Sequence, residues 1–194
     1  TEKMGRHEKA AELFLQAGDF KKAAALFSQA GKPGRAAVLF QEKGNSLEAA
    51  RLFGLAGDWA KSAELNMRAG YPLRAAEAFE KVGDFARAAE QYEKHFQENV
   101  SYASGFSSGN PSADQKSALL AGRLWEKAGD VRRAAAIFSK GGYFKEAGRA
   151  SLASGEPTRA AELFLRAEDA ASAAAAYEQA GDAVKAATLR GEVA

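Results

Sequence analysis

The chain has 194 residues and a mass of 20.5 kDa, enough for one sizeable domain or two small ones. Hydrophobic residues make up 46% and charged residues 27%, a balance typical of ordinary globular proteins and not of disordered ones. The net charge of +2 is spread evenly, which argues against a strongly basic nucleic-acid-binding surface, and the absence of cysteine excludes disulfides, thiolate nucleophiles and cysteine-ligated metals.

The sequence repeats every 13 residues, first over 4–94 and again over 115–192. Seven units fill the first range and six fill the second, as in "AGDFKKAAALFSQ" from Ala17 and "AGDVRRAAAIFSK" from Ala128. A fixed short period of this kind is the sequence signature of a repeat architecture. We number the positions of each unit from one to thirteen, so that Ala17 and Ala128 both occupy position one.

Each unit predicts one short amphipathic helix. Positions four, seven, eight and eleven carry apolar or small residues, which places these residues on one helix face. Position eight is alanine or glycine in every unit and position eleven is mostly aromatic, so a ring can fill the space beside closely approaching backbones. Glycine at position two ends one helix and aspartate at position three caps the next, as at Gly18 and Asp19.

Helices of about ten residues are too short to be stable alone in water, so each of them must pack on its neighbours. Three-residue turns force consecutive helices to run antiparallel. The prediction is therefore an all-α protein, a solenoid of about 13 short antiparallel helices arranged as 26-residue helical hairpins. We expect one continuous solenoid over residues 1–194, because the period resumes with the same pattern after its interruption.

The unit "AGD-F-x-x-AA-x-L-F", seen at 17–27, resembles the tetratricopeptide-like (TPR-like) α-solenoid superfamily in an unusually short form. The resemblance extends over nearly the whole chain. Two units make 26 residues, against roughly 34 in a standard tetratricopeptide repeat, so that family's residue map of a peptide-binding groove does not transfer. The resemblance implies a right-handed superhelix of helical hairpins that presents a protein-binding surface.

The period is interrupted at residues 95–114, near the middle of the chain. No glycine follows Lys94 and none stands at position two of the next unit, so both flanking helices are expected to be longer than the others. The segment "SYASGFSSG" (101–109) then forms a flexible tip on a protruding helical hairpin. Tyr102 and Phe106 on this tip are the leading candidates for partner contact, because exposed aromatic side chains anchor interfaces well.

Four further departures from the repeat are candidates for partner binding. Asn66 and Ser151 replace the ring at position eleven. Tyr71 and Tyr143 occupy the turn position usually held by aspartate, where we expect them to be exposed. Ordinary drift between repeats is the other explanation for each departure.

Position six is basic in most units, which places a row of cations along the helices at Lys22, Arg35, Lys61, Arg74, Arg87, Arg133 and Arg159. One interpretation is local pairing with the acidic residues three positions before and three positions after. The other is a basic ridge that binds an acidic partner or a nucleic-acid backbone. Local pairing is the simpler account, because it also offsets the unfavourable position of a cation near a helix N-terminus.

No catalytic, metal-binding or cofactor-binding residue is predicted. Histidine occurs only at His7 and His95, and neither belongs to a metal-ligating or catalytic cluster. The glycines lack the spacing of a phosphate-binding loop and serve instead to end helices. We therefore expect a protein that is not an enzyme.

The expected function is that of a scaffold or adaptor module that binds another protein. The chain enters its repeat by Met4, as expected of a piece of a longer protein, and the lack of cysteine fits a cytoplasmic location. The apolar runs are far shorter than the roughly 18 residues of a membrane span, so no membrane insertion is expected. Self-assembly of the chain and nucleic-acid binding through the basic ridge are the two alternatives.

Overall fold

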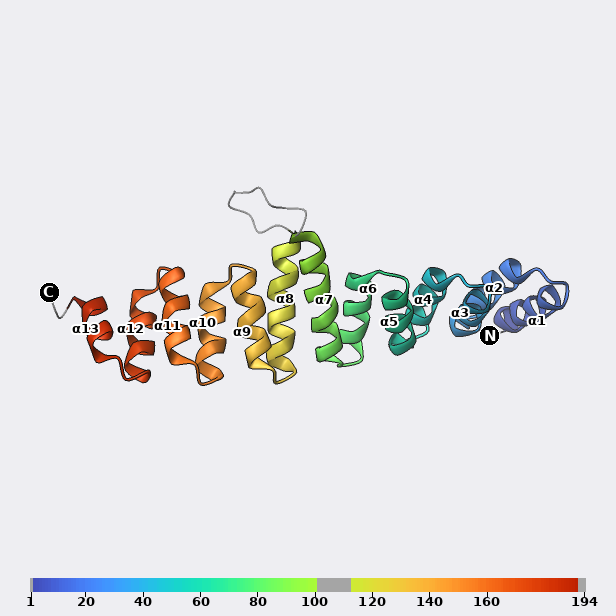
Figure 1. Cartoon of the computed structure of the whole chain (residues 1–194). Helices are drawn as coiled ribbons and strands as arrows, with labels where there is room; N and C mark the ends of the chain where they lie inside the picture. Colours follow the sequence, from blue (N-terminus) through green and yellow to red (C-terminus); the bar gives the residue numbers. More distant parts are fainter. Residues whose placement is uncertain (1, 101–112, 192–194) are drawn as a thin grey trace. The chain divides into compact units, whose positions relative to one another are not determined.

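The computed structural model describes residues 2–100 and 113–191, and within these ranges the chain forms thirteen α-helices and no strand (Figure 1). The all-α repeat architecture predicted from the period is thereby confirmed. Most helices run from position four to position thirteen of their unit. Their bounds are α1 (Glu2–Gln16), α2 (Phe20–Gln29), α3 (Pro33–Glu42), α4 (Ser46–Leu55), α5 (Trp59–Arg68), α6 (Pro72–Lys81), α7 (Phe85–Val100), α8 (Ala113–Lys127), α9 (Val131–Lys140), α10 (Phe144–Ala153), α11 (Pro157–Arg166), α12 (Ala170–Gln179) and α13 (Ala183–Arg190).

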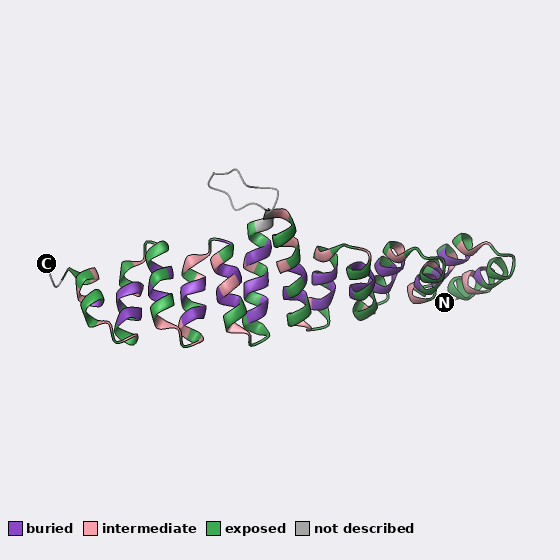
Figure 2. Ribbon diagram, in the orientation of Figure 1, coloured by how far each residue is buried: buried purple, intermediate pink, exposed green. Residues whose placement is uncertain are grey.

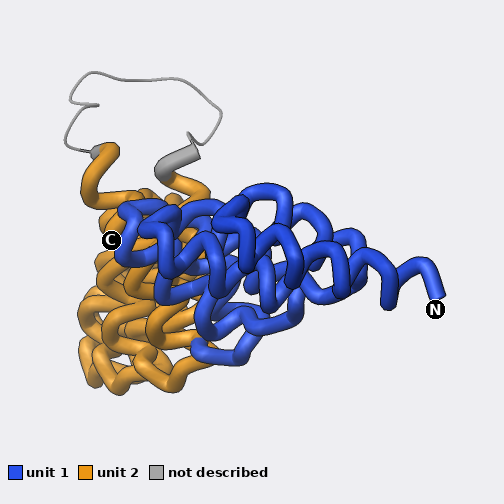
Figure 3. Tube along the Cα trace, turned by 90° about the vertical axis from the view of Figure 1, so that its right-hand side faces the viewer, with its two compact units in different colours: residues 1–84 blue, residues 85–194 orange. Residues whose placement is uncertain are grey.

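The helices form two compact units, Thr1–Asp84 with α1 to α6 and Phe85–Ala194 with α7 to α13 (Figure 3). Within each unit, every helix packs against the next helix of the chain. A single continuous solenoid over residues 1–194 stays a prediction.

In the helix core, large aromatic rings pack against small residues of the neighbouring helix. Buried residues lie on the helix faces that meet neighbouring helices (Figure 2). Phe138 of α9 is only 1% exposed, and a β-carbon added at Gly122 of α8 would lie 2.3 Å from its ring. Phe164 of α11 is placed in the same way against Gly148 of α10, where the corresponding distance is 2.8 Å. A ring at position eleven therefore packs on the small residue at position eight of the preceding unit.

The predicted signals at the helix ends are confirmed. The Asp58 carboxylate accepts a hydrogen bond from the backbone N–H of Lys61 at the start of α5, and Gly57 immediately before it has φ +81°. Because a residue with a β-carbon is strained at such a positive φ, glycine is the favoured residue at this position. The same combination of glycine and capping aspartate recurs before α2, α9 and α13.

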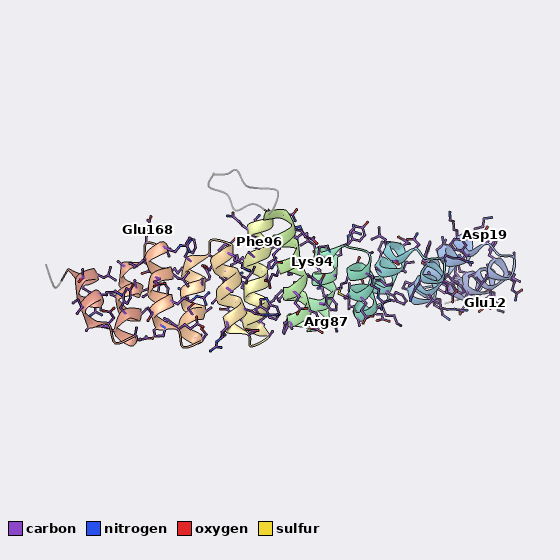
Figure 4. The ribbon with its side chains drawn as sticks, in the orientation of Figure 1. Glu12, Asp19, Arg87, Lys94, Phe96 and Glu168 are labelled. Atoms are coloured by element: carbon purple, nitrogen blue, oxygen red, sulfur yellow. The ribbon has the colours of Figure 1, made fainter. Side chains whose placement is uncertain are left out.

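Glu168 breaks this rule, since it occupies the glycine position between α11 and α12 with φ 56° (Figure 4). A left-handed conformation costs a residue with a β-carbon roughly 1–2 kcal/mol. We therefore expect Glu168→Gly to raise the free energy of unfolding by about 1 kcal/mol, measured by urea denaturation. Glu168→Ala keeps the β-carbon and removes only the charge, so a similar gain in that variant would contradict the backbone explanation.

Asp169 caps α12 and is held more firmly than an ordinary cap. Its carboxylate accepts a hydrogen bond from the Ser172 backbone N–H, and its Oδ2 lies 2.8 Å from Nζ of Lys145 on α10. The hydrogen bonds from Lys145 and Ser172 lower the pKa of the Asp169 carboxyl from 3.8 to about 2. A carboxyl whose pKa is lowered by folding stabilises the fold above its unfolded pKa and loses that contribution as the pH falls towards its folded pKa.

We accordingly expect Asp169→Asn, which keeps a capping oxygen, to melt below the wild type at about pH 6. The difference should shrink as the pH is lowered from about 4 to about 2, because the wild-type carboxylate is then protonated as well. Melting curves followed by circular dichroism across this range test the prediction. A difference that stays constant down to about pH 2 would contradict it.

The interruption of the period lengthens two helices, as predicted. The helices α7 and α8 have 16 and 15 residues, against ten in α9, and they project beyond α9 on one side (Figure 1). The Nδ1 of His95 lies 3.0 Å from the Ser117 hydroxyl, and the Trp125 indole N–H donates a hydrogen bond to Glu93. These contacts join the two long helices. The tip residues Tyr102 and Phe106 lie outside the described residues.

Candidate binding groove

The cations at position six are largely engaged by neighbouring carboxylates. Lys22 and Lys61 lie 2.9 Å and 2.8 Å from the capping aspartates three residues before them, and Arg159 lies 2.9 Å from Glu156. Arg133 and Arg35 also have carboxylate neighbours, respectively Glu90 with Asp130 and Glu8 with Glu12 (Figure 4 labels Glu12 and Asp19). Hydrogen bonding from Lys22 and from Lys61 lowers the pKa of Asp19 and of Asp58. Local pairing thus accounts for most of the row.

Many of these cations also cover an aromatic ring. The cation at position six lies over the ring at position eleven of the preceding unit, eight residues earlier in the chain. The distances to the ring centroid range from 4.1 Å to 5.3 Å for Lys22 over Phe14, Arg35 over Phe27, Lys61 over Phe53, Arg133 over Trp125 and Lys185 over Tyr177. Such cation–π contacts are favourable at these distances. Sequence reasoning overlooked them, although the constant spacing of eight residues is visible in the repeat.

Arg74 of α6 lacks both kinds of neighbour, the capping carboxylate three residues earlier and the aromatic ring eight residues earlier. Its unit carries Tyr71 in place of the capping aspartate, and the residue eight positions earlier is Asn66 in place of a ring. The Arg74 guanidinium lies over the Tyr71 ring instead, 5.3 Å from the centroid, and has no carboxylate partner within the described residues. Arg87, which belongs to the same row of position-six cations, is exposed on α7 and also has an interaction partner (Figure 4). Arg74 thus lacks both the carboxylate and the ring that most of its repeat counterparts contact.

Asn66, one of the predicted candidates, is buried with only 5% of its surface exposed. Its amide Nδ2 donates a hydrogen bond of 2.9 Å to the backbone carbonyl of Ser62 and lies 3.4 Å from the Ser62 hydroxyl. The side chain is therefore bound to its own helix, one turn back, and does not extend towards α4 as a ring would. Ser62 is also buried and stands where every other unit has alanine.

A groove of about 450 Å³ opens beside Asn66, between α4, α5 and α6 of the first unit. This volume falls within the about 300–1,000 Å³ typical of ligand pockets. The buried residues that line it are small or polar, and the exposed ones are apolar or charged. The buried group is Ala50, Gly54, Ser62, Asn66 and Ala78, and the exposed group is Leu47, Arg51, Leu55, Trp59, Arg74, Glu77 and Lys81.

The missing ring explains why the groove is there. Elsewhere a ring at position eleven packs on position eight of the preceding unit, and for Asn66 that residue is Ala50. Both Asn66 and Ala50 line the groove. Gly54 lines the groove on the α4 side, and its lack of a β-carbon lets the Trp59 ring pack closely against it, since a β-carbon there would lie 3.1 Å from that ring. The groove is thus the space that a ring fills in other units.

The remaining predicted candidates are scattered. Ser151 on α10 is fully buried, and its hydroxyl has no hydrogen-bond partner within the described part of the chain. Tyr71 is exposed as expected, at 41%. Tyr143 was expected to be exposed but is half-buried, because its ring packs close to Gly141, and this burial raises the pKa of the phenol. Asn66, Tyr71 and Arg74 lie close to one another in the compact unit of residues 1–84. Ser151 and Tyr143 belong to the compact unit of residues 85–194.

The described residues contain neither a metal-binding cluster nor a helix that could span a membrane. Three or more histidine, aspartate or glutamate side chains nowhere gather in a way that could hold a metal ion within 2–100 and 113–191. In the same ranges, each helix is too short or too polar to cross a bilayer.

Comparison with models of protein families gave no match, and comparison with curated protein sequences gave none either. Solved structures similar to this chain include TPR-like repeats of a kinesin light chain candidate from Podosopora anserina, at 15% identity and a TM-score of 0.33, with 97% of this chain and 92% of that chain covered. BtubC (BKLC) from P. vanneervenii is similar at 18% identity and a TM-score of 0.36, with 97% of this chain and 87% of that chain covered. The succession of short antiparallel helices makes the chain an all-α helical repeat protein. It is similar to TPR-like repeat proteins.

Proposed function

We propose that this chain is a non-catalytic scaffold or adaptor module that binds another protein in the cytoplasm. The observation that carries the proposal is the groove beside Asn66, a partly apolar opening bordered by exposed apolar side chains. Interfaces gain most of their binding energy where a few anchor side chains enter such openings. The exposed Leu47, Leu55 and Trp59 around the groove provide the apolar contact surface.

The state of the cations favours protein binding over nucleic-acid binding. A surface that binds the nucleic-acid backbone needs cations whose charge is available to phosphates. Lys22, Lys61 and Arg159 already lie within 3 Å of a carboxylate of this chain. A net charge of only +2 points in the same direction.

The proposal is tested by isolating a partner from the native host and measuring its affinity for the purified chain. Asn66→Phe restores the ring that most other units carry and fills the groove, so we expect it to weaken partner binding at least about tenfold while leaving the helical content intact. Arg159→Gln serves as the control, because Arg159 lies outside the groove, in the compact unit of residues 85–194. This variant should bind the partner as the wild type does. If no protein binds the chain specifically, the proposal fails.

A further inference from the structure

We propose that the groove beside Asn66 accepts an aromatic side chain from a partner protein, at a point where that partner also carries a carboxylate. This inference rests on the proposed function and specifies the partner's chemistry. The partner's ring would take the place of the aromatic ring that other units carry at position eleven. The partner segment would thus complete the packing of α4, α5 and α6.

The shape and lining of the groove favour a ring. In other units this space is filled by phenylalanine, tyrosine or tryptophan, as at Phe53, Tyr177 and Trp125. The Ala50 methyl group on its inner side is the counterpart of the small residues that carry the rings of Phe138 and Phe164. A flat ring between closely spaced helix backbones fits such a space better than a branched aliphatic side chain.

The position of Arg74 favours a ring independently of shape. A cation at position six covers the ring eight residues earlier, and Arg35 and Arg133 do so at 4.1 Å and 4.4 Å from the centroid. Arg74 is the corresponding cation for residue 66, and it lines the groove. Since Asn66 offers no π face, an incoming ring would give Arg74 the contact that its counterparts have. Tyr71, the present neighbour of Arg74, is exposed and stands immediately before α6.

The charges around the groove favour a carboxylate beside that ring. Arg74 and Lys81 both line it, and neither has a carboxylate within ion-pair distance among the described residues. Arg51 is already paired with Glu48, and Glu77 is the acidic residue of the lining. The unpaired groups that line the groove, Arg74, Lys81 and Glu77, therefore carry a net positive charge. A carboxylate of the partner would be complementary to that charge.

The occupant is inferred to be a protein segment, because the groove is open along the surface and bordered by the exposed Leu55 and Trp59. Three blocked dipeptides serve as probes in a titration of the isotope-labelled chain followed by nuclear magnetic resonance. They are N-acetyl-Trp-Glu-amide, N-acetyl-Leu-Glu-amide, which lacks the ring, and N-acetyl-Trp-Gln-amide, which lacks the charge. We expect the first to shift the Asn66 side-chain amide signal and to bind about 3–10-fold more tightly than either of the others.

Three variants assign the effect to the groove. Asn66→Phe should abolish binding of N-acetyl-Trp-Glu-amide, and Arg74→Gln should remove most of the preference for tryptophan over leucine. Arg74→Lys should retain part of that preference, because lysine covers a ring at the same position in Lys22 and Lys61. Arg159→Gln is the matched control. Arg159 also occupies position six and also follows a unit without a ring, but Glu156 pairs with it, so no change is expected.

Equal affinity for the tryptophan and leucine probes would overturn the inference, as would signal shifts that lie outside α4 to α6 or an Arg74→Gln variant that binds like the wild type. Because Arg74 is exposed, that variant is expected to fold even if Asn66→Phe does not. The two proposals can fail separately. A partner whose binding ignores both Asn66→Phe and Arg74→Gln refutes this inference alone, whereas a dipeptide that binds as expected without any protein partner refutes the proposed function.

Discussion

Phe138→Ala is expected to lower the free energy of unfolding by about 3–5 kcal/mol, the range found when a buried phenylalanine is truncated. The Phe138 ring is 1% exposed and packs on Gly122, so its removal leaves a cavity between α8 and α9 that their backbones cannot close. Urea denaturation followed by fluorescence measures the loss. The chain has 2 tryptophans, and a Trp59→Phe background leaves Trp125 of the second unit as the reporter.

Phe14→Ala is the matched control for this prediction. Phe14 also occupies position eleven, but in α1 its ring is 37% exposed, so truncation removes less buried surface. We expect a loss of less than about 2 kcal/mol, followed by circular dichroism. Comparable losses at Phe14 and Phe138 would show that burial against the preceding unit is not what makes the ring important.

Gly122→Leu is expected to lower the free energy of unfolding by about 3 kcal/mol, because it overfills a packed interface. A β-carbon at this position alone would lie 2.3 Å from the Phe138 ring, and leucine adds further carbon atoms. The better helix propensity of leucine returns less than about 1 kcal/mol. Urea denaturation of the same Trp59→Phe background provides the measurement.

Gly5→Leu gives the control in another helix, since nothing lies within 4 Å of a β-carbon at Gly5. That variant should match the wild type or exceed it slightly, within about 1 kcal/mol. The double variant Gly122→Leu with Phe138→Ala should lose less than the sum of the single losses, because the new side chain occupies the space that the ring vacates. Strict additivity would mean that the two residues do not share one packing site.

The ends of most helices could be predicted from the sequence, the exception being α1, which begins at Glu2 and runs through Gly5. Their ends depend on local chemistry, such as the glycine and capping aspartate at Gly57 and Asp58, and these signals act within one turn of the backbone. The pairing of Lys61 with Asp58 could be predicted for the same reason, since three residues along a helix always place two side chains side by side. The lengthening of α7 and α8 followed from the missing glycines.

The candidate site could be predicted only in part. Asn66 stood out because it departs from the repeat, but the sequence does not show that its amide bonds back to Ser62 or that a groove opens beside Ala50. Ser151 departs in the same way and is fully buried, and Tyr143 is half-buried where Tyr71 is exposed. Identical departures from the repeat thus have different outcomes, because the neighbouring helices differ in the side chains that they bring to each position.

The sequence alone determined that this protein consists of short helices, where most of them begin and end, and which face of each helix is apolar. Only the tertiary structure decided that rings pack on the preceding unit, that cations at position six cover those rings, and that Arg74 lies over Tyr71 instead. The physical reason is the range of the interactions. Capping and helical pairing act within three or four residues of one helix, whereas the groove depends on how closely three separate helices approach, which their packed side chains determine together.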